Sequence, residues 1–445
     1  MSGINLQHQI NYRIQPGGKL IGSLRVPGDK SISHRSIMLG SLADGVTEVT
    51  GFLEGEDSLA TLNAFRQMGV AIDGPTQGRV TIRGVGMHGL QAPDGALDLG
   101  NSGTSMRLLT GLLAGQGMAV TLTGDSSLSG RPMRRVIDPL SRMNASIVST
   151  EAFTAPLQIH PQSPLQGIDY QLPMASAQVK SALLLAGLCA EGETCITEPA
   201  PTRDHTERML QGFGYPVRRD GNRICLTGGG RLSACDIDIP ADISSATFFL
   251  VGVSIAEGSE MVLQHVGINP TRDGVISILK LMGAEIELLN EREVGGEPVA
   301  DIRVTSTELH GIDIPEELVP LAIDEFPAIF VAAACARGET RLRGAEELRV
   351  KESDRIQVMA EGLQRLGIEA DPTPDGIVIQ GGALQGGKVE SHGDHRIAMS
   401  FAMAGLRATG PIEIADCANV NTSFPGFVLS AADMGLQIAE VINSG

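Results

Sequence analysis

The sequence is built from a unit that recurs six times. Each copy has an apolar segment of helical length, a glycine, a short apolar strand, a polar loop and an amphipathic second helix. The glycines after the first helix are Gly45, Gly115, Gly192, Gly258, Gly338 and Gly410. Because the period is roughly 65 to 80 residues, each copy is expected to be a whole βαβα-type unit rather than a solenoid repeat.

The two helices of each copy have recognisable ends. The second helix is predicted to stop at Met68-Gly69, Met143-Asn144, Phe213-Gly214, Met282-Gly283, Leu366-Gly367 and Met434-Gly435. The first helix is predicted to begin at a polar cluster, namely Lys30-Ser31, Asn101–Thr104, Ser176–Gln178, Asp242–Ser244, Asp324-Glu325 and Asp394–Arg396. If the six first helices run in the same direction, their unpaired N–H groups face a common region, which favours anionic ligands.

The repeats predict an α/β protein of two domains. The first helices are apolar nearly all round, as in Leu183–Leu185 and Phe248–Leu250, so they belong inside a domain. Six units divide naturally into two sets of three, with a boundary near Pro240–Asp242. The leading strand, Tyr12–Leu24, is expected to return and pair with the second domain. Two domains that close on ligands in a cleft between them are the simplest arrangement.

Composition narrows the classes of ligand. The formal charge is −18, aromatic residues make up 3%, and tryptophan is absent, which argues against nucleic-acid binding. The longest apolar stretches, such as Ala328–Ala336, are too short to cross a bilayer, so no membrane partner is expected. Positive potential for an anion must therefore come from particular Lys and Arg residues.

The cysteines show no metal-binding spacing. They are Cys189, Cys195, Cys225, Cys235, Cys335 and Cys417, without CxxC or CxxH pairs. We expect reduced core thiols with no disulfide and no metal role. The stretch Met1–Gly18 lacks the apolar segment of a secretory signal, so a cytoplasmic protein is expected.

Cationic side chains stand at several predicted helix starts. Lys30 and Arg35 follow Gly28, which places two cations beside unpaired amides, as a phosphate group requires. A serine at such a place is also a common helix cap. Arg107 follows Asn101–Thr104, where the other interpretation is simply a capped helix.

Two further arginines precede predicted second helices. Arg131 is followed by Pro132, which is predicted to lie in the first helical turn. Arg131 is either a ligand residue or an ordinary surface cation. Arg203 stands four residues before Glu207, so the two are able to pair with each other along the helix.

Acidic groups at helix starts suggest acid–base chemistry. Asp324 is a candidate helix cap or, beside cations in a cleft wall, a general base. Lys351, Glu352 and Arg355 lie within one turn, either as a solvated ion pair or as part of a site. Arg396 opens the sixth inner helix. Capping alone does not explain Lys, Arg and Gln at these positions.

Taken in order and spacing, these motifs resemble the 5-enolpyruvylshikimate-3-phosphate (EPSP) synthase family. They are GDKSISHR at 28–35, NSGTSMR at 101–107, GRP at 130–132, SAQVK at 176–180, RDHTE at 203–207, NPTR at 269–272, KESDR at 351–355, DHR at 394–396 and TSFP at 422–425. Several of them are similar to the subgroup in which glyphosate tolerance is common. The resemblance implies six inverted αβ repeats, three per domain, around buried parallel helices. The implied domains are 27–241, and 1–26 with 242–445, with the active site in the cleft between them.

The same resemblance implies the reaction. Phosphoenolpyruvate transfers its enolpyruvyl group to the 5-hydroxyl of shikimate 3-phosphate, through a tetrahedral intermediate that loses phosphate. This is a step of the shikimate pathway towards aromatic amino acids, and it requires no metal or organic cofactor. The expected partners are these two small molecules and the inhibitor glyphosate, and the expected state is a cytoplasmic monomer.

Site residues follow by the same resemblance. Shikimate 3-phosphate is expected to contact Lys30, Ser31, Arg35, Ser176, Ala177, Gln178, Arg203, Asp324 and Lys351. Phosphoenolpyruvate is expected to contact Lys30, Gly103, Arg131, Gln178, Arg355 and Arg396. The expected catalytic residues are Asp324 as the base at the hydroxyl, with Glu352 and Lys30 as candidates for proton delivery.

At two positions this chain differs from some members of the resembled family. Many members carry a lysine near position 422, where this chain has Asn421, Thr422 and Ser423. Some tolerant members carry alanine at the position of Gly103. Partial glyphosate tolerance is our hypothesis.

Three other functions are alternatives to this one. The enolpyruvyl transferases that act on UDP-N-acetylglucosamine share the repeat, but they carry a reactive cysteine in a loop that here reads Asp125–Ser129. A non-catalytic anion-binding repeat protein would show binding without turnover. A dinucleotide oxidoreductase is poorly supported, because no GxGxxG motif follows a strand with an acidic residue about 20 positions on.

Overall fold

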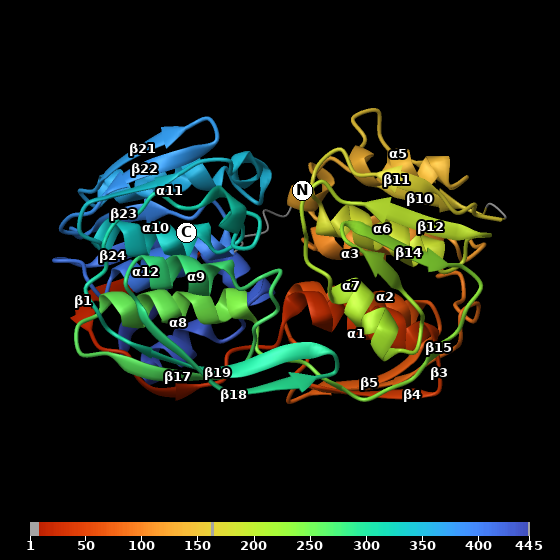
Figure 1. The fold of residues 1–445 in the computed structure, drawn as a ribbon, viewed down its shortest axis with the longest axis horizontal. Coiled ribbons are helices and arrows are strands. Elements are labelled where there is room, and N and C mark those ends of the chain that lie inside the picture. The colour runs from red at the N-terminus through yellow and green to blue at the C-terminus, as the bar shows by residue number, and fades with distance from the viewer. Residues whose placement is uncertain (1–8, 162–163, 444–445) are drawn as a thin grey trace, which may run out of the picture. The chain divides into compact units, whose positions relative to one another are not determined.

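The computed structural model describes residues 9–161 and 164–443, which form two compact units (Figure 1). Unit 1 comprises the described residues up to Pro27, then Ala241–Arg292, and the described residues from Pro298 onward. Unit 2 comprises Gly28–Pro240 and the short segment Glu293–Glu297. Each unit has its own apolar core.

Each core is built around three inner helices. Those of unit 2 are α1 (Lys30–Leu42), α3 (Gly103–Ala114) and α6 (Ala177–Gly187). Those of unit 1 are α8 (Ile243–Ile255), α10 (Phe326–Cys335) and α12 (His395–Ala404), which pack against one another (Figure 1). Every residue of α8 is buried, as its lack of a polar face predicted.

Close packing of the inner helices depends on small residues. Helix α3 packs against α6, and a Cβ added at Gly111 would lie 2.0 Å from the carbonyl oxygen of Ala182. Only glycine permits this backbone approach.

The predicted starts of the inner helices are confirmed, but the glycines thought to end them lie farther on. Five of the six helices have a side-chain N-cap, namely Asp29, Ser102, Ser176, Asp242 and Asp394. Of the glycines, Gly115 follows its helix directly, whereas Gly192 lies in the turn before the next strand. Gly192 has φ +86°, so it serves the turn rather than the helix end.

The second helix of each repeat ends where predicted. These helices are α2 (Glu56–Gln67), α5 (Arg134–Arg142), α7 (His205–Gly212), α9 (Gly274–Leu281), α11 (Arg355–Arg365) and α13 (Phe427–Met434). The stop residues Gly69, Asn144, Gly214, Gly283, Gly367 and Gly435 all have positive φ. This left-handed residue after the last turn satisfies helical carbonyl groups. The prediction for Pro132 is wrong, because α5 begins two residues later and a short helix, α4 (Ser126–Ser129), precedes it.

Each inner helix leads into a strand of a small sheet. In unit 2 the sheets are β16-β4-β6-β5, β7-β8-β10-β9 and β11-β12-β14-β13, with a short pair β15-β3. Their bounds are β3 Ala43–Asp44, β4 Val46–Thr50, β5 Ala71–Thr76, β6 Arg79–Arg83, β7 Leu97–Asp98, β8 Val120–Thr123, β9 Ser146–Val148, β10 Leu157–His160, β11 Asp169–Gln171, β12 Glu193–Thr197, β13 Arg218–Asp220, β14 Arg223–Thr227, β15 Leu232–Ser233 and β16 Ile237–Asp238. In each four-stranded sheet one edge strand pairs in parallel with the strand after the inner helix, and the remaining pairings are antiparallel.

Unit 1 also has three small sheets, and two of them include a strand from the start of the chain. Its sheets are β18-β19-β17-β2, β20-β22-β21 and β23-β24-β1-β25. Their bounds are β1 Gln9–Gly18, β2 Ile21–Leu24, β17 Glu260–Gly267, β18 Glu285–Val294, β19 Glu297–Thr305, β20 Glu339–Leu342, β21 Glu369–Thr373, β22 Gly376–Gln380, β23 Gly387–Glu390, β24 Ile412–Ala415 and β25 Leu436–Asn443. Strand β1 lies between β24 and β25, and β2 pairs with β17. The leading segment therefore returns to unit 1 as predicted, but as two strands.

One expectation about the cysteines is wrong. Cys195 on β12 and Cys225 on β14 form a disulfide. They lie directly opposite each other in the antiparallel register, with 4.1 Å between their Cα atoms, so strand pairing brings together residues far apart in sequence. The other four cysteines are free, and burial raises the pKa of Cys189 to about 11 and that of Cys335 to about 12.

Two features of the described residues bear on membrane and metal binding. No helix within residues 9–161 and 164–443 has the length and apolar character needed to cross a membrane. In the same residues, one group of ligand atoms is close enough for a metal ion, formed by Glu193, Cys195 and Cys225. The two sulfur atoms of that group are bonded to each other.

Candidate active site

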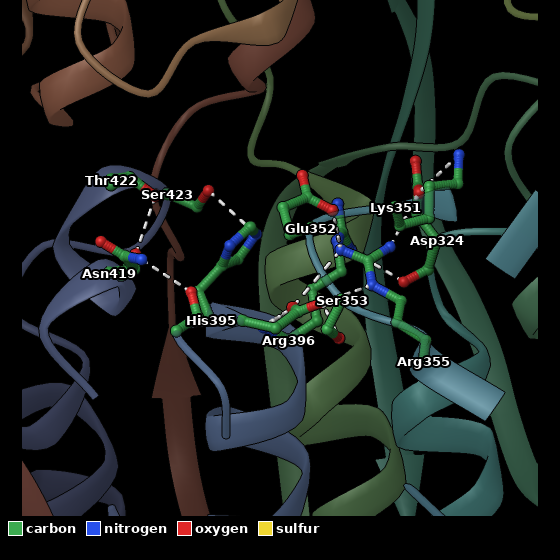
Figure 2. Close-up of polar contacts among 12 residues, drawn as sticks. Asp324, Lys351, Glu352, Ser353, Arg355, His395, Arg396, Asn419, Thr422 and Ser423 are labelled. Atoms are coloured by element: carbon green, nitrogen blue, oxygen red, sulfur yellow. Dashed lines mark hydrogen bonds and ion pairs between the residues drawn. The ribbon is translucent and has the colours of Figure 1, made fainter. Parts of the chain in front are cut away.

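A cluster of charged side chains lies in unit 1 where α10, α11 and α12 begin (Figure 2). At its centre is Arg355, whose side chain is buried. Its Nε donates to Asp394 Oδ2 at 2.8 Å, its Nη1 to Asp324 Oδ1 at 3.2 Å and its Nη2 to Glu352 Oε2 at 2.6 Å. Burial alone would lower the pKa of Arg355, but Asp394, Glu352 and Asp324 together raise it above its ordinary value. Arg355 therefore holds three carboxylates around one permanent cation.

The lysine of the cluster approaches the same carboxylate. Lys351 follows the 3-10 helix η2 (Glu346–Val350), and its Nζ lies 3.5 Å from Asp324 Oδ1 and 2.7 Å from Glu347 Oε1. Asp324 is not the cap of α10, because the N-cap residue is Glu325, whose side chain makes no capping hydrogen bond. Asp324 is instead placed between two cations, Lys351 and Arg355.

Arg396 joins the cluster from the first turn of α12. Its Nη1 donates to the carbonyl oxygen of Asp324 at 3.0 Å and lies 3.7 Å from Glu325 Oε1. Asp394 caps this helix by accepting from the N–H of Arg396 at 2.9 Å. The structure thus brings together all the residues of unit 1 for which a site role was predicted: Asp324, Lys351, Glu352, Arg355 and Arg396.

The segment around Thr422 is held by local hydrogen bonds (Figure 2). It forms the 3-10 helix η3 (Ala418–Thr422), next to the start of α12. Asn419 Nδ2 donates to the carbonyl oxygen of Gly393 at 2.7 Å, and Ser423 Oγ lies 3.2 Å from His395 Nε2. Amide and hydroxyl groups therefore stand where many members of the resembled family carry a lysine.

In unit 2, the two predicted cations of α1 differ in burial, because Lys30 is partly exposed and Arg35 is buried. Lys30, at the first position of α1, forms an ion pair with Asp57 of α2. Arg35 is buried, and its guanidinium donates to Thr206 Oγ1 at 2.7 Å, to Ser181 Oγ at 2.8 Å and to the carbonyl oxygen of Ser31 at 2.9 Å. Burial lowers the pKa of Arg35 to about 10, so it remains charged at neutral pH. Three of its five N–H groups are used in this way, which leaves two for a ligand.

The starts of α3 and α6 are joined by an amide. Gln178 accepts from Arg107 Nη1 at 2.8 Å through Oε1, and donates to Thr104 Oγ1 at 3.1 Å through Nε2. Ser176 caps α6, whose first residue is Ala177. Both predicted ligand residues therefore lie at the amino end of a buried helix, where unpaired N–H groups attract anions.

Arg131 and Gly103 lie beside this junction. Arg131 Nη2 donates to Asn101 Oδ1 at 2.6 Å and to Ser127 Oγ at 3.3 Å. A Cβ added at Gly103 would lie 2.9 Å from Arg107 Nη1 and 3.0 Å from Arg131 Nη1. The absence of a side chain at Gly103 therefore leaves room for two guanidinium groups.

The loop that carries Arg203 is attached to α6 by a buried lysine. Lys180 Nζ lies 2.9 Å from Glu198 Oε1 and 2.7 Å from Glu207 Oε1. Glu207 is thus engaged by Lys180, which the sequence did not suggest. Arg203 lies in the loop just before α7.

Comparison with known proteins shows the family to which the chain belongs. The model of the family described as EPSP synthase (3-phosphoshikimate 1-carboxyvinyltransferase) matches residues 14–430. The chain belongs to the EPSP synthase family. It is 70% identical over 430 residues to the 3-phosphoshikimate 1-carboxyvinyltransferase of Alkalilimnicola ehrlichii, covering 96% of each chain. It is also 70% identical over 423 residues to that of Methylococcus capsulatus, covering 95% of this chain and 97% of the relative.

The fold agrees with solved structures of EPSP synthases. The structure of EPSP synthase from Acinetobacter baumannii has a TM-score of 0.89 at 60% identity, and the match covers 97% of this chain and 100% of that one. The predicted fold class is confirmed. The chain is therefore an enzyme of the EPSP synthase family, rather than a member of the sister family or a non-catalytic binder.

Several residues that surround the predicted EPSP synthase site were not assigned a role from the sequence. They are Asp57, Asn101, Thr104, Arg107, Lys180, Thr206, Glu325 and Asp394. Most lie inside motifs that were noticed, such as DHR for Asp394 and SAQVK for Lys180. Their partners are distant in sequence: Asp394 pairs with Arg355, and Lys180 pairs with Glu198 and Glu207.

Proposed function

We propose that this chain transfers the enolpyruvyl group of phosphoenolpyruvate to the 5-hydroxyl of shikimate 3-phosphate and releases phosphate. The observation that carries the proposal is the cluster in which Arg355 holds Asp324, Glu352 and Asp394, with Lys351 and Arg396 beside it. Acids, bases and cations then stand within a few ångströms of one another, as a reaction between two anionic substrates requires.

Shikimate 3-phosphate is assigned to two sets of groups. In unit 2 these are Lys30, Ser31, Arg35, Ser176, Ala177, Gln178 and Arg203, and in unit 1 they are Asp324 and Lys351. Support comes from the positions of Ser176, Ala177 and Gln178 at the start of α6, and from the two unused N–H groups of Arg35. Each charge-assisted hydrogen bond to the phosphate contributes about 1.5 to 3 kcal/mol.

Phosphoenolpyruvate is assigned to cations that its phosphate and carboxylate groups can bridge. They are Lys30, Arg131, Arg355 and Arg396, with Gly103 and Gln178. Gly103 keeps space open between Arg107 and Arg131, and Arg131 is held by neutral groups that leave its charge uncompensated. Because this substrate carries two anionic groups, several arginines are used rather than one.

The reaction is an addition followed by an elimination. Asp324 accepts the proton of the 5-hydroxyl as the oxygen attacks C2 of phosphoenolpyruvate, and Glu352 or Lys30 supplies a proton to C3. In the tetrahedral intermediate the group that protonated C3 then takes a proton from the C3 methyl, while the C2–O bond to phosphate breaks with its electron pair on the phosphate, which restores the double bond. Each acid–base group accounts for roughly 10²- to 10⁴-fold of the rate.

Turnover with both substrates tests the proposal. Phosphate release should require phosphoenolpyruvate and shikimate 3-phosphate together, and the organic product should gain the mass of the enolpyruvyl group. Binding of both ligands without release of phosphate would support a non-catalytic binder. Release that depends on UDP-N-acetylglucosamine instead would assign the chain to the sister reaction.

The response to glyphosate, the oligomeric state and the location are part of the same proposal. We expect a cytoplasmic monomer, for which light scattering should give about the chain mass of 46.7 kDa. We expect partial tolerance, with glyphosate binding more weakly than phosphoenolpyruvate. Inhibition as tight as substrate binding would contradict the second expectation.

A further inference from the structure

A line of buried polar contacts in unit 1 reaches Arg396 from the start of α8. Arg272 Nη2 donates to Ser244 Oγ at 2.7 Å and to Asp242 Oδ1 at 3.0 Å. Ser244 Oγ donates in turn to Glu325 Oε1, which lies 3.7 Å from Arg396 Nη1. Arg272, Ser244, Glu325 and Arg396 are called the Glu325 relay below.

The relay is buried and electrically balanced. Arg272, Ser244 and Glu325 are at most 4% exposed. Counted with Asp242, it contains two arginines and two carboxylates, so its formal charges cancel. A buried carboxylate is costly unless it is hydrogen-bonded and paired with a cation. Ser244 supplies the hydrogen bond to Glu325, and Arg272 and Arg396 supply the positive charges on either side.

The relay contacts the Arg396 guanidinium through a single nitrogen atom, Nη1. Among the described residues, the hydrogen bond and the ion pair of this group both involve Nη1, which contacts the Asp324 carbonyl oxygen and Glu325. The opposite edge, Nε with Nη2, presents two parallel donors. This edge matches the two oxygens of a carboxylate or phosphate group. Orientation of that edge depends on where Nη1 is fixed.

We propose that Glu325 is a positioning residue for Arg396, held by Ser244 and Arg272, and that the relay sets the affinity for phosphoenolpyruvate. The inference rests on the proposed function, in which Arg396 binds that substrate. Glu325 is itself an anion near an anionic substrate, so direct attraction cannot be its contribution. Its contribution is to direct a cation, since a fixed guanidinium loses less entropy on binding.

Neutralising Glu325 is the first test. Glu325→Gln keeps the volume and the acceptor for Ser244 but removes the charge that attracts Arg396. We expect the KM for phosphoenolpyruvate to rise about tenfold, as for the loss of a charge-assisted contact, with the KM for shikimate 3-phosphate changed less than about twofold. Glu317→Gln is the matched control, because Glu317 is an exposed glutamate on the same connection before α10.

A double-mutant cycle separates positioning from a structural role. In an Arg396→Ala background, Glu325→Gln should leave the KM for phosphoenolpyruvate unchanged within about twofold, because the group that it directs is gone. Ser244→Ala retains both charges but breaks the relay, and should raise the same KM about threefold in the wild-type background only.

The outcomes are separable. Equal increases in both KM values, or an effect of similar size with and without Arg396, would overturn the positioning role. If Glu325→Gln does not fold, the Ser244→Ala cycle decides in the same way. Absence of turnover in the wild-type enzyme would instead refute the proposed function.

Discussion

The arginines assigned to the site have different hydrogen-bond partners in the two units. In unit 1, Arg355 donates to three carboxylates, those of Asp394, Asp324 and Glu352. In unit 2, Arg35 donates to two hydroxyl groups and a carbonyl, and Arg131 donates to an amide and a hydroxyl. Neutral acceptors fix the direction of a guanidinium without cancelling its charge, whereas carboxylates cancel it.

This difference suggests a division of work. Arg35 and Arg131, which the proposal assigns to anionic ligands, have neutral hydrogen-bond partners. The cluster of unit 1 holds three carboxylates beside a permanent cation, and two of them are the proposed acid–base groups Asp324 and Glu352. Lys30 of unit 2 differs from Arg35 and Arg131, because it forms an ion pair with the Asp57 carboxylate.

The largest expected effect comes from removing the proposed base of unit 1. Asp324→Ala should lower kcat by about 10²- to 10⁴-fold, because no other group is assigned to take the hydroxyl proton. Steady-state phosphate release measures it, and an unchanged melting temperature shows that the fold is retained. Asp313→Ala, at a largely exposed carboxylate of the same unit, is the control. A near-normal kcat would remove Asp324 as the base and make Glu352 the next candidate.

A smaller effect is expected where unit 2 leaves space between its cations. Gly103→Ala places a methyl group against Arg107 and Arg131, whose side-chain ends must move. The KM for phosphoenolpyruvate should rise roughly tenfold, as for one weakened charge-assisted contact, and inhibition by glyphosate should weaken at least as much. Gly95→Ala is the control, since nothing lies within 4 Å of its added Cβ. An unchanged KM would show that the two arginines do not contact this substrate.

The third prediction concerns a buried histidine of unit 2 that lies near two cations. Burial, and then Lys30 and Arg35, lower the pKa of His34 well below its ordinary value of 6.5, so the ring is neutral in the folded state. The unfolded state takes up this proton first, so stability should fall as the pH drops below about 6.5. The slope due to this one group is about 1.4 kcal/mol per pH unit, or tenfold in the unfolding equilibrium.

Replacing the ring tests that assignment. His34→Gln should flatten the dependence of the free energy of unfolding on pH between about 5 and 6.5, measured by urea titration. An identical slope in both proteins would show that His34 is not the group responsible. His88→Gln, at an exposed histidine of the same unit, should leave the slope unchanged.

The smallest effect comes from giving an arginine of unit 2 the kind of partner found in unit 1. Ser127→Asp adds a carboxylate beside Arg131, and should raise the KM for phosphoenolpyruvate about threefold, less at high salt because the site is exposed. Ser126→Asp adds the same charge one residue earlier in α4 and is the control. Equal effects from the two variants would indicate a general charge effect rather than compensation of Arg131.

Many features of the fold could be predicted because they depend on near neighbours in the sequence. The residues that cap the inner helices, such as Asp29 and Ser102, act on an N–H three residues away. The glycine or asparagine that ends each second helix acts through its own φ angle. The ends of most inner helices were predicted too late, because a glycine in a turn, such as Gly192, and a glycine at a helix end look alike in sequence.

The partners that come from different repeats could not be predicted from the sequence. Arg355 and Asp394 are 39 residues apart, and Ser244 and Glu325 are 81 apart. The pair Cys195 and Cys225 was likewise expected to be two free thiols until the strand register placed them opposite each other. No local spacing rule relates such positions.

The sequence by itself therefore determined the six repeats, the inner helices and which side chains stand at their amino ends. Tertiary structure decided the long-range partners of the cations, such as the Asp394 carboxylate for Arg355 and the Thr206 hydroxyl for Arg35. The physical reason is range: caps and turns are set by hydrogen bonds within about four residues, whereas the charge of a buried group depends on whichever segments packing brings beside it.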